Sequence, residues 1–171
     1  MEKTETCQSC EFQEDLDTIR QVPFFSHLAL DTLKVIAYLC NRETFKPGEK
    51  IFQQKEDDGR AIIILHGKAR MIHESESGFR EIREYGDGDF LGSLSLVGTG
   101  PRLFSLEAKT ETACLALERK KFVKSMLQFP DQMPKVFQAL VERVAMWEKR
   151  FFAEHTDDCE SCVKAIGVSF L

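Results

Sequence analysis

The residues best able to do chemistry in this chain lie between Gly86 and Ala108, where five glycines precede a single arginine. Gly92 has no Cβ, so the backbone at this position lets a ligand approach closely. A helical turn over residues 93–97 would direct unpaired N–H groups into the same space, and such groups attract phosphate. Arg102 adds a planar guanidinium that can hold a phosphate through two parallel hydrogen bonds. The stretch therefore predicts a pocket for an anion.

This stretch resembles the phosphate-binding cassette of cyclic nucleotide-binding domains, the sensor half of the catabolite activator protein and fumarate-nitrate regulator family. The matching residues are Gly88, Asp89, Phe90, Gly92, Leu94, Leu96, Pro101 and Arg102. The resemblance covers residues 16–152 and implies an anionic small-molecule ligand, cAMP or cGMP. The ligand-binding residues that it implies are Gly92, Ser93, Leu94, Ser95, Arg102 and Leu103.

Three positions depart from the pattern of that family. Ser93 stands where the family has a glutamate that binds the ribose hydroxyl. Leu103 and Phe104 stand where the family has two small residues beside the phosphate. Two alternatives follow for the pocket: it binds an anionic ligand, or Leu103 and Phe104 fill the space and leave it without one.

The second group of reactive residues consists of two Cys-x-x-Cys pairs, Cys7 with Cys10 and Cys159 with Cys162. If the two ends of the chain meet, these pairs provide the four thiolates of a tetrahedral zinc site or of an iron–sulfur cluster. Free or reversibly oxidised thiols are the alternative. The rival hypothesis is therefore a metal- or redox-responsive structural module with a ligand-free pocket.

Composition limits the remaining classes of function. The chain has 171 residues, which suffices for one domain with tails, and a net charge of −5 with an isoelectric point near 5.5. This charge argues against direct DNA binding, because affinity for a polyanion requires clustered Lys and Arg. No apolar stretch is long enough to cross a membrane, and the N-terminus lacks an apolar leader, so we expect a cytoplasmic protein.

Catalysis is not indicated by any motif. The four histidines are scattered, and neither Ser93 nor Ser95 is followed by an evident base. We therefore expect a non-enzymatic regulatory module that acts on an unknown protein partner. Two further cysteines, Cys40 and Cys114, lie in apolar runs and are expected in the core.

Elements that position the anion pocket follow from the hydrophobic pattern. Helical spacing over residues 15–40, interrupted at Pro23, predicts two short helices, with Asp31 as the N-cap of the second. Short alternating segments separated by Gly and Pro turns predict strands over residues 44–118. The fold class is mainly β with flanking helices, a double-stranded β-helix (jelly roll) with a long C-terminal helix. The expected divisions are 1–13 (tail), 14–130 (domain), 131–157 (long helix) and 158–171 (tail).

The long C-terminal helix carries a stripe of apolar residues at heptad spacing: Met133, Phe137, Leu140, Val144, Trp147 and Phe151. Such a stripe is typical of a parallel two-helix contact, although it also suits a helix that packs on its own domain. In the family that the cassette resembles, the equivalent helix forms the dimer interface. We therefore expect a homodimer through this helix.

Overall fold

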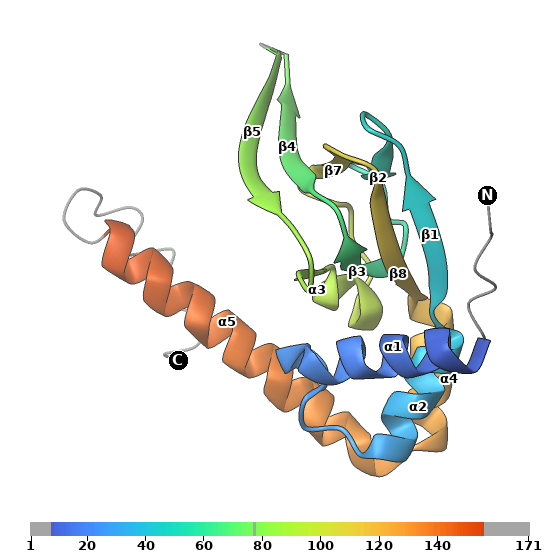
Figure 1. Cartoon of the computed structure of the whole chain (residues 1–171). Coiled ribbons are helices and arrows are strands. Elements are labelled where there is room, and N and C mark those ends of the chain that lie inside the picture. Colours follow the sequence, from blue (N-terminus) through green and yellow to red (C-terminus); the bar gives the residue numbers. More distant parts are fainter. Residues whose placement is uncertain (1–7, 77, 156–171) are drawn as a thin grey trace, which may run out of the picture.

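The computed structural model describes residues 8–76 and 78–155, which form two four-stranded antiparallel sheets flanked by helices (Figure 1). The helices are α1 (Gln8–Gln21), η1 (Pro23–Phe25), α2 (Leu30–Leu39), α3 (Ser93–Val97), α4 (Arg119–Gln128), η2 (Pro130–Gln132) and α5 (Met133–His155). The strands are β1 (Asn41–Phe45), β2 (Lys50–Phe52), β3 (Arg60–His66), β4 (Ala69–Ser75), β5 (Gly78–Tyr85), β6 (Phe90–Leu91), β7 (Ser105–Ala108) and β8 (Thr112–Glu118).

The sheets have the strand orders β1-β8-β3-β6 and β2-β7-β4-β5. Strand β5 therefore forms an edge of the second sheet. The predicted jelly roll with flanking helices and a long C-terminal helix is confirmed. The helical turn over residues 93–97, on which the anion pocket depends, is present as α3.

The side chains of β3 alternate between its two faces and show how the layers are held together. Ala61 and Ile63 on β3 pack against the helices, whereas Ile62 and Ile64 pack against the second sheet. All four side chains are at most 3% exposed, so β3 is covered on both faces. A continuous apolar run suits such a doubly covered strand. The first sheet is therefore the middle layer, between the helices and the second sheet.

The N-terminal helices differ from the prediction in two details. The first helix begins at Gln8 instead of Asp15, and Phe12 in its second turn packs against the helical core. The N-cap of α2 is Ala29 and not Asp31, and it makes no side-chain cap. The Ala29 N–H instead donates to Gln132 Oε1 at 3.0 Å, a tertiary contact that the local sequence pattern does not contain.

Helix α5 leaves the barrel and extends well beyond it (Figure 1). Its core-facing residues are Val136 and Ala139, which are 0% and 6% exposed and do not belong to the predicted stripe. The stripe itself is divided. Met133 and Leu140 pack partly against the core, whereas Phe137 and Trp147 are more than half exposed.

None of the helices that the structure describes is long and apolar enough to span a membrane.

Candidate anion-binding site

The loop between β6 and β7 forms one wall of the site. Gly92 has a φ of +86° and directly precedes α3, so the chain turns there through the left-handed region. A Cβ at this position would lie 2.7 Å from the carbonyl oxygen of Arg60 and 2.8 Å from Arg102 Nη1. Gly92 is therefore required both for the turn and for the close approach of the Arg102 guanidinium.

Arg102 is held on two sides by hydrogen bonds. Its Nε donates to Asp58 Oδ1 at 2.9 Å, and its Nη2 lies 2.7 Å from the same oxygen. Nη2 also donates to the carbonyl oxygen of Arg60. The guanidinium carbon lies 4.1 Å from the centre of the Phe52 ring. These contacts fix the plane of a side chain that is only 8% exposed.

The third guanidinium nitrogen of Arg102, Nη1, takes part in none of these contacts. It donates no hydrogen bond to any residue in the described ranges. Burial lowers the pKa of Arg102, and the nearby Asp58 carboxylate opposes this effect. An arginine keeps its proton under all ordinary conditions. The site therefore presents a fixed cation with one free terminal nitrogen, Nη1, beside the turn at Gly92.

A cavity of about 140 Å³ opens at this place, lined by Phe52, Met71, Leu91, Gly92, Arg102, Leu103 and Phe104. Its walls are apolar except for the guanidinium of Arg102 and the backbone at Gly92. Such a cavity suits a compact anionic group and is smaller than the 300–1,000 Å³ that is usual for whole small-molecule ligands. The remainder of a larger ligand would have to lie outside the cavity, over its rim.

The six residues predicted to bind the ligand do not all line this cavity. Gly92, Arg102 and Leu103 do. Ser93 is buried at 4% exposed and Leu94 is 63% exposed, and neither lines the cavity.

Ser95 does not line the cavity either. Its carbonyl oxygen accepts a hydrogen bond from Arg119 Nε at 2.6 Å. Arg119, the first residue of α4, also pairs with Asp57. Adjacent carboxylates on the β2–β3 loop thus hold two arginines: Asp57 holds Arg119, and Asp58 holds Arg102.

The alternative that Leu103 and Phe104 fill the pocket is supported only in part. Leu103 is 73% exposed and lies at the rim. Phe104 lines the cavity and makes an edge contact with His73, with ring centroids 5.8 Å apart. The open volume beside Arg102 remains.

Three residues of the site were not predicted from the sequence: Asp58, Phe52 and Met71. Asp58 lies in the Asp57-Asp58-Gly59 turn, which signals a loop but does not indicate which cation its carboxylate would meet. Phe52 and Met71 lie in alternating strands, where an apolar side chain that faces a ligand looks like one that faces the core.

Helix α5 is connected to the cassette through Phe90, the residue of β6 that precedes Leu91 and Gly92. Arg143 on α5 donates to the carbonyl oxygen of Phe90 at 3.3 Å, and its guanidinium carbon lies 5.9 Å from the centre of the Phe90 ring. The same ring packs against Phe24 and Phe25 of η1, with centroids 5.4 Å and 5.2 Å away. A shift of the cassette would therefore change the contacts of Phe90 with α5 and η1 directly.

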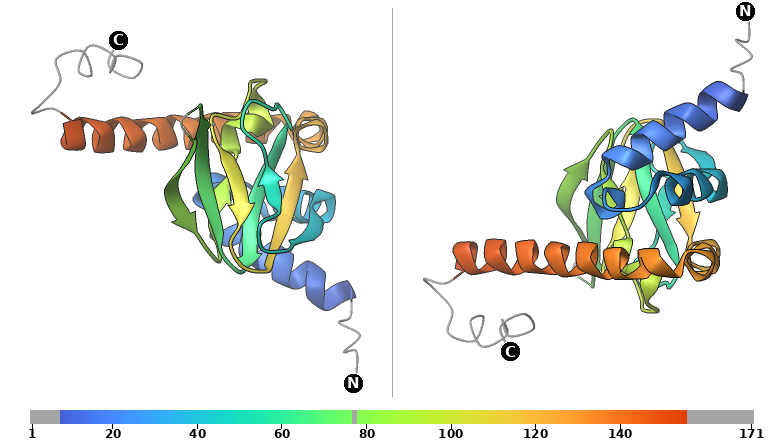
Figure 2. Two further views of the ribbon diagram at one scale, coloured as in Figure 1. Left: turned by 90° about the horizontal axis from the view of Figure 1, so that it is seen from above. Right: turned by 90° about the horizontal axis from the view of Figure 1, so that it is seen from below.

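The predicted metal ligands Cys7, Cys159 and Cys162 lie outside the described residues. Cys10 is exposed on the first turn of α1. The described residues contain no group of three or more potential metal ligands. Both views of Figure 2 place the first turn of α1 and the last turn of α5 at opposite ends of the domain, so a joint site within one chain finds no support.

Two cysteines behave as expected for core residues. Cys114 is fully buried, and burial raises the pKa of its thiol to about 12. Cys40 is partly covered, and burial together with the Asp15 carboxylate raises its pKa to about 12 as well. Such thiols are not ionised at neutral pH and are therefore poor nucleophiles and poor metal ligands.

Comparison with known proteins identifies the family of this chain. A family model described as the cyclic nucleotide-binding domain matches residues 42–129. Over 110 residues the chain is 31% identical to the cGMP-dependent protein kinase, isozyme 2 forms cD5/T2, of Drosophila melanogaster. That match covers 62% of this chain but only 12% of the kinase, so the chain corresponds to a small part of that relative.

Solved structures agree on the fold. A cyclic nucleotide-binding-like protein from Brucella abortus has a TM-score of 0.62 at 26% identity, over 66% of this chain and 97% of that one. The regulatory domain of Toxoplasma gondii PKA, solved with cAMP, has a TM-score of 0.68 at 21% identity, over 81% of this chain and 51% of that one. The family match covers more than half of the chain, from β1 to the end of α4, and it includes both Gly92 and Arg102. This chain belongs to the cyclic nucleotide-binding domain family.

Proposed function

We propose that this chain is a regulatory module that binds a cyclic nucleotide at Arg102 and transmits the binding through α5. The observation that carries the proposal is the orientation of Arg102, whose Nη1 is free beside Gly92 while its other two nitrogens are fixed by Asp58 and Arg60. A fixed arginine whose Nη1 is free in an apolar cavity is suited to an anionic phosphate. Relatives that are named as cGMP-dependent kinases, or that were solved with cAMP, support a cyclic nucleotide as the ligand.

Binding would change the charge balance at the site. Before a ligand arrives, Asp58 is the only carboxylate that pairs with Arg102 in the described part of the chain. A cyclic phosphate adds a second negative charge, which Nη1 and the backbone N–H groups around Gly92 would hold. Ser93 offers a hydroxyl where a carboxylate is usual in the family, so the ribose would be held by fewer or weaker bonds.

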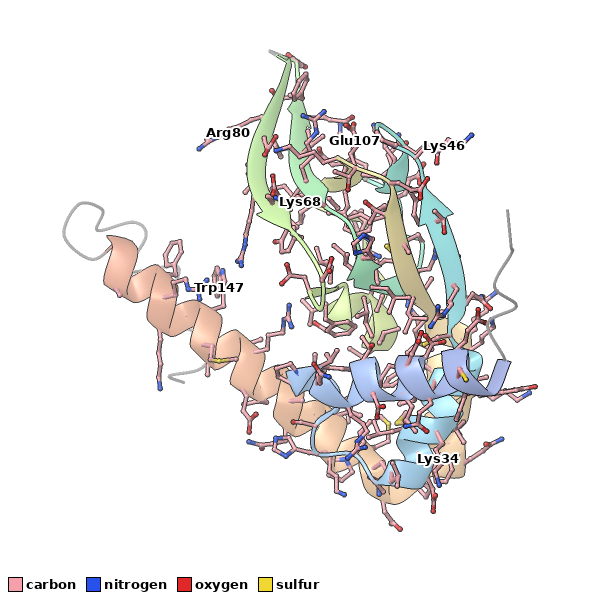
Figure 3. All side chains as sticks on the ribbon, in the orientation of Figure 1. Lys34, Lys46, Lys68, Arg80, Glu107 and Trp147 are labelled. Carbon is pink, nitrogen blue, oxygen red and sulfur yellow. The ribbon has the colours of Figure 1, made fainter. Side chains whose placement is uncertain are left out.

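The signal would pass from the cassette to α5 through Phe90. Arg143 and the rings of Phe24 and Phe25 contact Phe90 on the side away from the cavity. A ligand changes the position of α5 only if it binds one position more tightly than the other. Trp147, the only tryptophan of the chain, is 60% exposed on the part of α5 that leaves the barrel (Figure 3), and its fluorescence therefore reports on this movement.

The same helix would carry the homodimer contact. Phe137, Val141 and Trp147 are 57%, 62% and 60% exposed along α5, and Trp147 stacks on Phe151 with centroids 5.4 Å apart. Exposed apolar residues on a helix that extends from its domain favour pairing with a second helix.

Calorimetric titration of cAMP and cGMP into the wild-type protein and the Arg102→Ala variant tests the assignment. The loss of a charge-assisted phosphate contact should weaken binding by about 10- to 150-fold. Arg102→Lys keeps the charge but loses the planar fork, and it should fall between the two. Arg150→Ala, which removes an exposed arginine of α5, is the matched control and should bind as the wild type does.

Thermal unfolding of each variant shows whether it is folded. Equal affinity of a folded Arg102→Ala variant and the wild type would refute the proposed site. If neither nucleotide binds the wild-type protein at millimolar concentration, the proposed ligand class is wrong.

A further inference from the structure

Helix α4 exposes a row of alternating lysines and apolar residues to solvent. The row consists of Lys120, Val123, Lys124 and Leu127. Residues three and four positions apart share one face of a helix, so these four side chains lie side by side. All four residues are exposed, and Val123 and Leu127 are 44% and 77% exposed. We call this row the α4 stripe.

The charges of α4 oppose the ordinary rules of helix stability. The helix contains four cations and no acidic residue, and three of the cations lie in its first turn, where the helix dipole favours negative charge. Two of them, Arg119 and Lys121, have carboxylate partners. Lys120 and Lys124 form no ion pair with any residue in the ranges 8–76 and 78–155, and like charges four positions apart repel each other. Such departures from local rules are expected where a surface has a function.

Helix α2 lies antiparallel to α4 in the same layer. At one end, the Ala29 N–H, which precedes α2, donates to Gln132 Oε1, which lies beyond the end of α4. At the other end, Asn41 follows α2 and its Nδ2 donates to Glu118 Oε1, directly before α4, at 3.4 Å. Both helices bury apolar side chains in the same core cluster. Their exposed residues therefore lie together on the outer side of the helical layer.

The outer side of α2 adds a lysine and an aromatic ring to the α4 stripe. The side chain of Lys34 is 49% exposed and pairs with Asp31 at 3.3 Å, and Tyr38, one turn further on, is 80% exposed. Figure 3 shows Lys34 directed away from the barrel, at the opposite end of the molecule from Lys46. We call Lys34 and Tyr38 together with the α4 stripe the α2–α4 face. This face is positively charged, although the net charge of the chain is −5.

The composition of the α2–α4 face favours a lipid surface over a protein partner. Lysine is depleted at protein–protein interfaces, and leucine and valine are uncommon among the residues that dominate binding there. At a bilayer surface, a lysine stem lies along the apolar boundary while its ammonium group reaches the headgroups. A tyrosine ring suits the boundary itself, and exposed leucine and valine enter the edge of the acyl region. Anionic headgroups attract the unpaired ammonium groups.

We propose that the α2–α4 face binds reversibly to membrane surfaces that contain anionic lipid, with Lys120 and Lys124 at the headgroups and Leu127 at the acyl boundary. Such a contact is peripheral and requires no helix that spans the bilayer. Each lysine near an anionic surface strengthens binding about fivefold, and salt screens this attraction. The inference goes beyond the proposed function, because no residue of the α2–α4 face lines the cavity beside Arg102.

Co-sedimentation of the full chain with lipid vesicles tests this proposal. At low salt, we expect the protein to bind vesicles of two parts phosphatidylcholine to one part phosphatidylserine at least about tenfold more tightly than vesicles of phosphatidylcholine alone. The double variant Lys120→Gln/Lys124→Gln should lower the partition coefficient onto the anionic vesicles about 30-fold. Leu127→Gln, which removes the apolar anchor, should lower it about fivefold.

The double variant Lys46→Gln/Lys149→Gln is the matched control. It changes the net charge by the same amount, but both of its exposed lysines lie outside the α2–α4 face, so it should bind as the wild type does. Thermal unfolding shows whether each variant is folded. No binding of the wild type to the anionic vesicles, equal binding to both kinds of vesicle, or equal binding by the two double variants would overturn the proposal. No nucleotide is present in these measurements, so such a result would leave the proposed function intact.

Discussion

Asp58 and Arg102 form an ion pair in which Nη2 and Oδ1 are 2.7 Å apart and the side chains are only 17% and 8% exposed. The second carboxylate oxygen of Asp58, Oδ2, is buried and accepts no hydrogen bond from any described residue. Asp58 therefore neutralises and orients Arg102, but part of its own hydrogen-bonding capacity is unused. Any phosphate at Arg102 has to share the guanidinium with this carboxylate.

Asp58→Asn should lower stability and raise ligand affinity at the same time. Removal of the carboxylate leaves a mostly buried guanidinium without its counter-charge, which costs about 3 kcal/mol in comparable buried pairs. The same change removes the internal competitor of the phosphate, so cyclic nucleotides should bind more tightly and restore the lost stability. Chemical denaturation with and without ligand measures both effects.

Asp57→Asn is the control for this substitution, because Asp57 pairs with Arg119 and not with Arg102. It should leave ligand affinity unchanged. An Asp58→Asn protein that is as stable as the wild type, or that binds ligand more weakly, would contradict the role assigned to this carboxylate.

Gly92→Ala should damage both the fold and the site. The substitution forces an L-residue into a φ of +86° and places its Cβ against the Arg60 carbonyl and Arg102 Nη1. Strain of this kind costs about 1–3 kcal/mol, and displacement of Arg102 should reduce ligand affinity. Denaturant unfolding and calorimetry measure the two losses.

Gly98→Ala provides the comparison within the same loop. Gly98 has a φ of −132°, and a Cβ there would meet only the Leu94 carbonyl oxygen at an ordinary 3.7 Å. This variant should behave as the wild type does. Equal effects of the two substitutions would show that Gly92 has no special role.

Phe137→Glu should weaken self-association without unfolding the domain. Phe137 is 57% exposed, so the monomer loses little packing, whereas a charge within a helix–helix contact is costly. We expect the dissociation constant of the dimer to rise at least about tenfold, as measured by analytical ultracentrifugation.

Tyr38→Glu on α2 replaces a ring that is 80% exposed and should leave association unchanged. A wild-type protein that remains monomeric at high micromolar concentration would rule out the proposed dimer.

Cys114 should resist thiol reagents in the native state at pH 8, while the exposed Cys10 reacts. Burial raises the pKa of Cys114 to about 12, so the native protein keeps this thiol protonated between pH 9 and pH 12 while the unfolded chain loses its proton. Stability should therefore fall as the pH rises through this window. Mass spectrometry after alkylation gives the reactivity, and denaturation at several pH values gives the slope. Modification of both cysteines at equal rates would contradict the burial.

Local chemistry made part of the site predictable from the sequence. The spacing of Gly92 and Arg102 was sufficient to predict an anion pocket, because a left-handed turn and a guanidinium fork each require one particular residue type. A helical turn over residues 93–97 was a condition of that pocket, and α3 fulfils it. These features depend on residues that are close together in the chain.

The remainder depends on contacts between distant segments. Asp58 lies 44 positions before Arg102, and only the pairing of the β2–β3 loop with the cassette brings them together. The N-cap of α2 was misplaced because the helix begins at Leu30, before Asp31, and its N-cap residue Ala29 is held by Gln132, 103 positions away in the chain. The stripe on α5 was correctly identified as apolar, but Val136 and Ala139, just beside it, are the residues that face the core.

The central claim, that a cyclic nucleotide binds the folded domain at Arg102, is tested most directly by thermal unfolding with and without 1 mM cGMP or cAMP. A ligand that binds only the folded state raises the midpoint, and at 100 times its dissociation constant it adds about 2.7 kcal/mol, a shift of about 5 °C or more. The account predicts such a shift for the wild type and little or none for Arg102→Ala. No shift with either nucleotide, or the same shift in both proteins, would contradict it.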